Sequence, residues 1–509
     1  MKINSLLTAG AIRHPDKEAL ITTDRTWTYQ QLHDDAARTA AFLKSQGTQQ
    51  GSTVAAMTYN EAEFVLAAFA TWMLGGVFVP INHKLAVPEA GYMIGHCEAT
   101  HGIVSPELHE TAAKAAPQVQ WTTTDTATGL LSKIVDHEPL IEEHDNDDDA
   151  ALILYTSGTT SSPKGCVHTH DGITRLLPLI ALSLDHHRNT RTLVAMPIWH
   201  SAPLNVSTMP TLFVGGTVIL QREYHPIETL QLLGTQRATA FFGPSIAFLA
   251  PLQVTAKMGM DFSDFDFSTM ESWTFGGAPI DEATTRKIID NYQPGTHRQL
   301  YGMSELGPAG TELRPEDQVR KAGSIGNYSM LGVEMRVVKA DQTDAGPGET
   351  GEIWFNTPTR MKEYLHNPEA TREAFVGPWY RTGDIARVDE DGYYYIVDRM
   401  KDIIIVGGEN VFSLEVEEAV AKHPRVADVA VVGTPDPDWG QQVTAVVVTS
   451  DGQPLEQTDL REFLSDHLAR YKIPRFVHTV EELPRNPSGK LLKHVLRDEV
   501  AEAPQRTTS

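Results

Sequence analysis

The peptide Tyr155-Thr156-Ser157-Gly158-Thr159-Thr160-Ser161-Ser162-Pro163-Lys164-Gly165 begins at the end of the short apolar run 151–155. The apolar run predicts a buried strand that passes directly into a loop of small, hydroxyl-bearing residues. Small residues let backbone N–H groups approach phosphate oxygens closely, and Lys164 adds a mobile positive charge. A surface linker often has the same composition, so this peptide alone leaves phosphate binding and a linker as alternatives.

The loop differs from a Walker A motif. That motif requires Gly-Lys followed by Ser or Thr, whereas Lys164 stands between Pro163 and Gly165. Gly489-Lys490 also fails the requirement, because Leu491 follows it. The sequence therefore does not predict a P-loop nucleotide hydrolase.

The residues before the loop alternate between helical and strand patterns. Apolar residues recur at helical spacing through 28–47, and Gly47 is suited to end that helix. Short apolar runs at 54–57 and 76–81 predict buried strands. This alternation indicates an α/β fold with mostly parallel sheets covered by helices.

The pattern changes after about Gly323. Short strands at 333–338, 351–355 and 393–397 predict a small β-rich subdomain over residues 323–398. A helix is predicted from about Ser413, which is assigned as its N-cap. The predicted organisation is a large N-terminal domain of residues 1–400 and a smaller α+β C-terminal domain of residues 401–509.

Composition narrows the class of protein. The net charge of −24 argues against a nucleic-acid partner, and no apolar run is long enough to cross a membrane. The two cysteines, Cys97 and Cys166, cannot form a disulfide framework and fit a reducing cytoplasm. We therefore expect a cytoplasmic protein without stable membrane insertion.

Five further segments join the Ser/Thr-rich loop in one family pattern. They are Gly276-Gly277-Ala278-Pro279; Tyr301-Gly302-Met303-Ser304-Glu305; Tyr380-Arg381-Thr382-Gly383-Asp384; Asp398-Arg399-Met400-Lys401-Asp402 with Gly407-Gly408-Glu409; and Pro484-Arg485-Asn486-Pro487-Ser488-Gly489-Lys490. In this order they resemble the adenylate-forming (ANL) superfamily, which includes acyl-CoA synthetases, peptide-synthetase adenylation domains and firefly-type luciferases. The resemblance spans nearly the whole chain and implies ATP, Mg²⁺ and coenzyme A as substrates and cofactor.

The resemblance also implies a role for residues at matching positions. The phosphates of ATP would contact Thr156, Ser157, Gly158, Thr159, Thr160 and Lys164. The rest of the nucleotide would contact Gly276, Gly277, Ala278, Pro279, Tyr301, Gly302, Met303, Ser304, Asp384 and Arg399. Glu305 would coordinate Mg²⁺, a hard cation that favours carboxylate and phosphate oxygens. An ordinary exposed or capping carboxylate is the alternative for Glu305.

Further implied roles concern the chemistry and the acyl group. Lys490 would be the principal catalyst of adenylation. The small domain would rotate about a hinge at Lys401 between the two steps, bringing Gly407, Gly408 and Glu409 to the pantetheine arm. His200 would lie between the acyl pocket and the thiol path, with a core histidine as the alternative. Trp199, Asn205, Phe242 and Trp273 are predicted to line the acyl pocket, which would suit a fatty or aryl acid.

Two features of the sequence qualify this pattern. Ser161 stands where the family loop has glycine, which leaves the loop geometry and nucleotide affinity open. His168 and His170 have the spacing of a paired metal motif, but without a third ligand scaffold roles are favoured.

The leading hypothesis is an acid–CoA ligase. The alternatives are an enzyme that loads a carrier protein's phosphopantetheine, a luciferase-like oxidase and a nucleotide-binding regulator without catalysis. The oligomeric state stays open.

Overall fold

The structure is a computed structural model that describes residues 2–141, 147–156, 163–277, 280–406, 409–437, 439–465, 467–485 and 491–502. The chain divides into two compact units. Unit 1 contains residues 1–335 and 354–381, and unit 2 contains residues 336–353 and 382–509. The chain therefore passes from one unit to the other three times, and Lys401 lies inside unit 2. The predicted boundary at residue 400 separates a large domain from a mobile C-terminal domain. This boundary stays a prediction.

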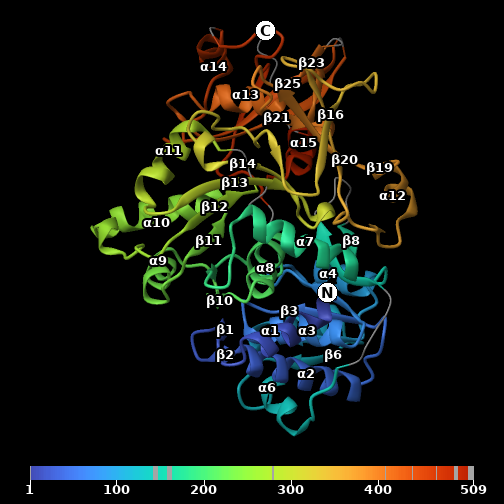
Figure 1. The fold of residues 1–509 in the computed structure, drawn as a ribbon. Helices are drawn as coiled ribbons and strands as arrows, with labels where there is room; N and C mark the ends of the chain where they lie inside the picture. Colours follow the sequence, from blue (N-terminus) through green and yellow to red (C-terminus); the bar gives the residue numbers. More distant parts are fainter. Residues whose placement is uncertain are drawn as a thin grey trace. The chain divides into compact units, whose positions relative to one another are not determined.

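Unit 1 contains a seven-stranded sheet in the order β18-β8-β7-β4-β3-β5-β6, labelled in part in Figure 1. The strands are β18 (Glu363–Tyr364), β8 (Lys164–Thr169), β7 (Ala150–Thr156), β4 (Val77–Pro80), β3 (Thr53–Met57), β5 (His101–Val104) and β6 (Gln120–Thr123). The central strands pair in parallel, and the hairpin β7–β8 and the edge strand β18 are antiparallel. The predicted strands at 54–57, 76–81 and 151–155 are confirmed.

A second, nine-stranded sheet of unit 1 has the order β15-β14-β13-β12-β11-β9-β10-β1-β2. The strands are β15 (Tyr328–Ser329), β14 (Gly310–Leu313), β13 (Thr296–Gly302), β12 (Ser272–Gly276), β11 (Ala240–Gly243), β9 (Arg191–Val194), β10 (Thr217–Leu220), β1 (Glu18–Ile21) and β2 (Thr26–Thr28). Pairing is parallel from β13 across to β1 and antiparallel at both edges. Mostly parallel sheets with connecting helices confirm the predicted α/β class.

Most helices of unit 1 connect these strands, and α1 precedes the first of them. The helices are α1 (Leu6–Arg13), α2 (Tyr29–Ser45), α3 (Ala62–Met73), α4 (Val87–His96), α5 (His109–Ala115), α7 (His170–Ser183), α9 (Pro226–Thr235), α10 (Ser245–Met258) and α11 (Glu282–Asn291). The short α6 (Leu130–Lys133), α8 (Met209–Phe213) and α12 (Pro368–Ala374) complete this set.

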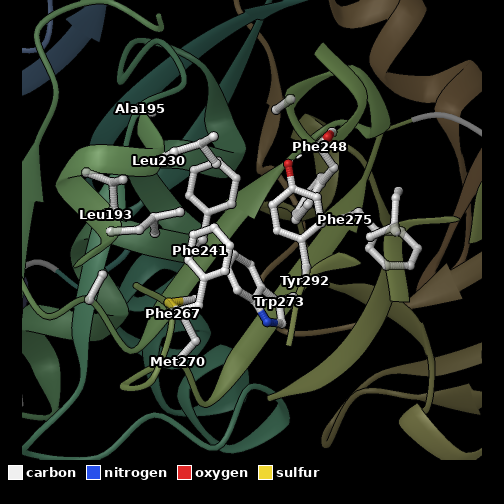
Figure 2. Close-up of a cluster of buried hydrophobic side chains, with 14 of the residues drawn as sticks. Leu193, Ala195, Leu230, Phe241, Phe248, Phe267, Met270, Trp273, Phe275 and Tyr292 are labelled. Carbon is white, nitrogen blue, oxygen red and sulfur yellow. Dashed lines mark hydrogen bonds between the residues drawn. The ribbon is translucent and has the colours of Figure 1, made fainter. Parts of the chain in front are cut away.

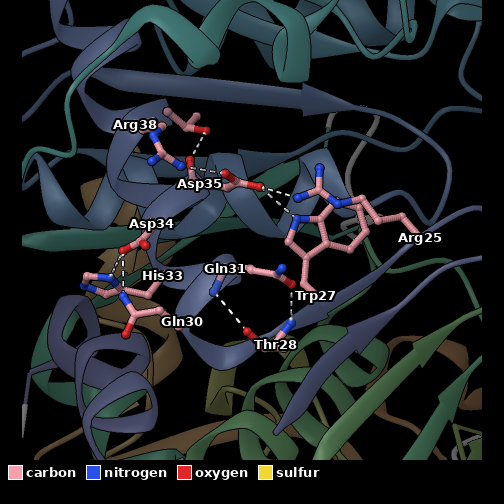
Figure 3. Close-up of polar contacts among 10 residues, drawn as sticks. Arg25, Trp27, Thr28, Gln30, Gln31, His33, Asp34, Asp35 and Arg38 are labelled. Atoms are coloured by element: carbon pink, nitrogen blue, oxygen red, sulfur yellow. Dashed lines mark hydrogen bonds and ion pairs between the residues drawn. The ribbon is translucent and has the colours of Figure 1, made fainter. Parts of the chain in front are cut away.

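The first predicted helix is α2, and its start is fixed by side chains (Figure 3). The Thr28 hydroxyl accepts a hydrogen bond from the Gln31 N–H at 3.3 Å, and the Gln31 side chain accepts one from the Thr28 N–H at 3.0 Å. This reciprocal capping box satisfies donors that the first turn leaves unpaired. Gly47, with φ +104°, follows the last turn, so the predicted stop is confirmed.

A five-stranded sheet lies where the chain crosses between the units. It contains β16 (Glu334–Val338), β17 (Thr350–Asn356), β20 (Trp379–Val388), β19 (Phe375–Val376) and β21 (Tyr394–Arg399). These strands confirm the predicted β-rich region. The border between the units falls within two strands, after Ile353 in β17 and after Arg381 in β20.

The rest of unit 2 is an α+β structure. A second five-stranded sheet contains β23 (Glu409–Val411), β22 (Ile404–Val406), β25 (Gly440–Thr449), β24 (Val426–Asp436) and β26 (Phe476–Thr479). Its helices are α13 (Ser413–Val420), α14 (Gln457–Leu464) and α15 (Lys493–Glu502). Val431, Val443 and Val447 are fully buried in its core or nearly so.

Ser413 requires a correction. It begins α13 as the first helical residue, and Phe412 occupies the N-cap position without a side-chain bond. The N–H and hydroxyl of Ser413 both donate to the buried Asp398 carboxylate at the end of β21, the hydroxyl at 3.0 Å. Lys493 of α15 joins this network, at 2.6 Å from the Ser413 hydroxyl and 2.7 Å from Glu417. Ser413 therefore donates its hydrogen bonds to Asp398, a residue outside the helix, whereas the local pattern predicted that it caps α13.

Candidate active site

The Ser/Thr-rich loop connects the two strands of a hairpin. Thr156 ends β7, Lys164 begins β8, and the two residues face each other in the antiparallel ladder. Ser157, Gly158, Thr159, Thr160 and Ser161 lie outside the described residues. A strand follows the loop where a Walker A motif has a helix, so the structure agrees with the exclusion made from sequence.

Tyr364 brings two predicted site residues together. The Lys164 ammonium lies 5.0 Å from the centre of the Tyr364 ring, within the range of a cation–π contact. The Tyr364 hydroxyl lies 3.3 Å from a carboxylate oxygen of Glu305 and 3.3 Å from the Tyr380 hydroxyl. The lysine predicted to bind phosphate and the carboxylate predicted to bind metal therefore share one aromatic neighbour.

Sequence reasoning missed Tyr364 entirely. Tyr380 was visible as the first residue of Tyr-Arg-Thr-Gly-Asp, but it received no role. Burial raises the pKa of both phenols, and the nearby Glu305 carboxylate raises them further. Both hydroxyls therefore keep their protons at neutral pH and are able to donate them in hydrogen bonds.

The turn that carries Glu305 is held by its carbonyl groups. Four successive carbonyls, from residue 304 to residue 307, each accept a hydrogen bond from a partner distant in sequence. The donors are His168 Nε2 to Ser304 (2.8 Å), Met361 N–H to Glu305 (2.6 Å), the Thr359 hydroxyl to Leu306 (2.7 Å) and Asn205 Nδ2 to Gly307 (2.8 Å). Because all four carbonyls of this turn are hydrogen-bonded, its backbone is fixed, and the Glu305 carboxylate extends from a fixed position.

His168 therefore has the scaffold role that the sequence favoured. Its ring is fully buried, and burial lowers its pKa to about 4, so it is neutral at neutral pH. Neutral His168 must carry its proton on Nε2, because that atom donates to the Ser304 carbonyl. Asn205, predicted to line the acyl pocket, is 1% exposed and supports the same turn.

The nucleotide motifs lie at the ends of β12 and β13. Gly276 ends β12, and Gly277 follows it at the surface; Ala278 and Pro279 lie outside the described residues. Tyr301 and Gly302 end β13, and the half-buried Tyr301 ring lies 6.1 Å from Phe355. A side chain at Gly302 would come within 2.1 Å of the Pro308 carbonyl oxygen, so only glycine fits there.

Met303 and Ser304 lead into the Glu305 turn. Met303 is the N-cap residue of a 3-10 turn (Ser304–Leu306). The Ser304 hydroxyl lies 3.0 Å from the Ser201 hydroxyl, which belongs to the segment that follows His200. The predicted nucleotide motif and the predicted acyl segment are therefore adjacent.

Asp384 and Arg399 face each other on β20 and β21 of unit 2. Arg399 Nε lies 3.0 Å from the Asp384 carboxylate, which is almost fully buried. Gly383 turns immediately before it with φ +71°, and its N–H donates to Glu352 at 3.1 Å. Two residues predicted to bind the ribose and phosphate side of the nucleotide are therefore paired.

The structure describes only some of the other residues of unit 2 that were predicted to belong to the site. Lys401 is exposed in a 3-10 turn (Met400–Asp402), and Glu409 is exposed at the start of β23. Gly407, Gly408 and Lys490 lie outside the described residues. Their roles stay predictions.

His200 is exposed and stands just before a π-helix (Pro203–Thr208), an uncommon element that occurs often at functional sites. Its ring lies 5.8 Å from that of Trp199, which is half-buried. Trp199 Nε1 donates to Nδ1 of His83 at 3.2 Å. His200 is thus not a core histidine, and its catalytic role stays a prediction.

Trp273 lies in the aromatic core of unit 1 (Figure 2). Its side chain is fully buried, its Nε1 donates to the Pro294 carbonyl at 2.8 Å, and its ring is 5.0 Å from Tyr292. Phe241 opposes it on β11, so the next residue, half-buried Phe242, points to the other face of the sheet. The core accounts for the burial of Trp273, and its place in an acyl pocket stays a prediction.

Substitution of Trp273 and of Phe242 should therefore lower the free energy of unfolding by different amounts. Trp273→Ala should lower the free energy of unfolding by about 3–5 kcal/mol, because it leaves a large cavity and an unpaired carbonyl. Phe242→Ala should lower it by only about 1–2 kcal/mol, because that ring is half-buried. Urea unfolding followed by circular dichroism measures both values. Equal losses would contradict the assignment of the two faces.

The described residues fit a magnesium ion held mainly by phosphate. Among them, no group of three His, Cys, Asp or Glu side chains could hold a metal by itself. Mg²⁺ commonly uses one or two carboxylates together with substrate phosphates, and Glu305 would supply the carboxylate. Lys164, which contacts the same tyrosine, would supply positive charge to the phosphates. No helix in the described ranges is long and apolar enough to cross a membrane.

Comparison with known proteins agrees with this geometry. Residues 7–365 match the family described as AMP-binding enzyme, and residues 415–490 match its C-terminal domain. The chain is 36% identical over 471 residues to a feruloyl-CoA synthase from Amycolatopsis sp., covering 92% of this chain and 93% of the relative. It is 35% identical over 487 residues to a long-chain-fatty-acid–CoA ligase from Mycobacterium tuberculosis, covering 94% of each chain.

Solved structures share the fold. The o-succinylbenzoate CoA synthetase from Bacillus subtilis, in complex with its acyl-adenylate intermediate, aligns with a TM-score of 0.87. The two chains are 28% identical, and the alignment covers 99% of each.

Proposed function

The chain belongs to the AMP-binding enzyme family, and we propose that it joins a fatty or aryl carboxylic acid to coenzyme A. It is an AMP-forming acid–thiol ligase that acts through an acyl-adenylate. The observation that carries the assignment to this site is the contact of Tyr364 with both Lys164 and Glu305. A phosphate-binding cation and a metal-binding carboxylate are the two groups that ATP chemistry requires beside each other.

The first step joins two anions. The carboxylate of the acid attacks the α-phosphate of ATP, and pyrophosphate leaves. Positive charge must offset the repulsion, and the reactants must be held in line. In this proposal Lys164 and the Ser/Thr-rich loop hold the outer phosphates, Asp384 and Arg399 hold the ribose side, and Lys490 supplies the cation at the reacting centre.

Glu305 would hold the magnesium ion, whose charge offsets that of the phosphates when it is bound. In the second step the thiol attacks the acyl carbonyl, and AMP leaves. Trp199 and His200 would border the path of the acyl group and the thiol. Gly407, Gly408 and Glu409 would approach the pantetheine arm after rotation at Lys401.

The acyl acceptor separates two candidate enzymes. An acid–CoA ligase releases a free thioester, whereas a carrier-loading enzyme needs a protein-bound phosphopantetheine. Both relatives described above are CoA enzymes by name, which favours coenzyme A. We also propose a cytoplasmic location, which the two free, buried cysteines support.

The purified protein should release AMP from ATP in the presence of Mg²⁺, coenzyme A and a suitable acid. A panel of fatty and aryl acids, with acetate as a small control, should yield acyl-CoA products detectable by mass spectrometry. AMP release without acyl-CoA, together with loading of an added carrier protein, would replace coenzyme A by a carrier as acceptor. No pyrophosphate exchange with any acid would contradict the proposed activity.

A further inference from the structure

Tyr364 is held in place by the backbone around it. Its strand, β18, pairs antiparallel with β8, and Tyr364 faces Cys166, two residues beyond Lys164. The N–H groups of Lys362 and Leu365 donate to the carbonyls of Val167 and Gly165, at 2.7 and 2.8 Å. The side chain is 7% exposed. The backbone that carries the Tyr364 ring is therefore hydrogen-bonded to β8, the strand that begins with Lys164.

We propose that Tyr364 is a positioning residue that sets the relative placement of the Lys164 ammonium and the Glu305 carboxylate. This inference rests on the proposed function, which gives those two groups their roles toward phosphate and metal. Because one rigid side chain contacts both groups, a shift of the ring moves both.

The hydroxyl and the ring have different partners. The hydroxyl lies 3.3 Å from Glu305 and 3.3 Å from Tyr380, so it can donate to the carboxylate while it accepts from Tyr380. A donor at one carboxylate oxygen fixes the orientation of that group toward a metal. The ring face, 5.0 Å from the Lys164 ammonium, holds the cation near the loop.

This separation allows two substitutions to be compared. Tyr364→Phe keeps the ring beside Lys164 and removes only the donor to Glu305. Tyr364→Leu removes both contacts. Tyr328→Phe is the matched control. Tyr328 also has a cation beside its ring, Arg314 at 3.6 Å, but the contacts given for Lys164 and Glu305 do not include it.

The test measures binding rather than turnover. Mn²⁺ is titrated into each protein with a non-hydrolysable ATP analogue, and bound metal is followed by electron paramagnetic resonance. Binding of the same analogue in EDTA is measured separately by calorimetry. The thermal unfolding midpoint of each variant shows whether that variant is folded. If Tyr364→Leu does not fold, the comparison of Tyr364→Phe with the wild type is the test.

Tyr364→Phe should weaken Mn²⁺ binding about tenfold, while analogue binding in EDTA stays within about twofold of the wild type. Tyr364→Leu should also weaken analogue binding in EDTA by about threefold or more. Wild-type metal affinity in Tyr364→Phe would overturn the inference. Failure of the wild type itself to bind the metal–nucleotide complex would instead overturn the proposed function, and this inference with it.

Discussion

Lys490→Ala should reduce ATP–pyrophosphate exchange by about 100-fold or more, because it removes the cation proposed to offset the repulsion between carboxylate and phosphate. The second half-reaction, thioester formation from supplied acyl-adenylate, should stay within about threefold of the wild type, because pyrophosphate has already left. Isotope exchange measures the first value, and mass spectrometry of the thioester measures the second. The two assays together isolate the step at which the lysine acts.

Lys422→Ala is the matched control, because Lys422 is an exposed lysine of the same unit with no assigned role. It should leave both half-reactions unchanged. Undiminished exchange in Lys490→Ala would remove this lysine from the adenylation step. Equal loss in both assays would assign it a general effect on binding.

The second large effect is expected at the predicted hinge. Lys401→Pro should leave pyrophosphate exchange within about threefold of the wild type and lower thioester formation by about 100-fold, because proline fixes one backbone torsion and constrains the residue before it. The reason is geometric: in the proposed mechanism the two half-reactions need different groups at the same carbonyl, and the rotation at Lys401 would exchange them. Single-turnover assays of each half-reaction measure the two rates.

Lys401→Ala is the control, because it removes the charge and keeps the backbone free. It should retain both half-reactions. If Lys401→Ala and Lys401→Pro lose thioester formation equally, the side chain matters and the hinge assignment fails. If Lys401→Pro loses both half-reactions, the substitution has disturbed unit 2 as a whole.

Elements defined by local signals could be predicted from the sequence. The helix α2 follows from apolar spacing over residues 28–47 with Gly47 at its end, and these signals act within a few residues. The strand β7 and the loop after it follow from an abrupt change of residue type. The family pattern then placed Asp384 and Arg399 in one site, and the structure pairs them across two strands.

Features that depend on distant contacts could not be predicted. The donors to the Glu305 turn come from β8, the π-helix and the residues before β18, and no local pattern connects them. Tyr364 reaches its partners only because β18 joins the sheet beside β8. Ser413 was assigned as a cap because the local pattern does not show Asp398, fifteen residues earlier, which accepts its hydrogen bonds.

The hydrogen bonds from Ser413 to Asp398 bear on the proposed rotation at Lys401. Asp398 precedes Lys401 and Ser413 follows it, so the proposed rotation at residue 401 would carry one partner away from the other. Burial raises the pKa of the Asp398 carboxyl, and the departing donors would leave that group unsatisfied until new ones arrive. If the proposed rotation at Lys401 takes place, each turnover breaks and remakes this contact, and the slowest event of catalysis would then lie in the chain around Lys401 and not at the reacting atoms.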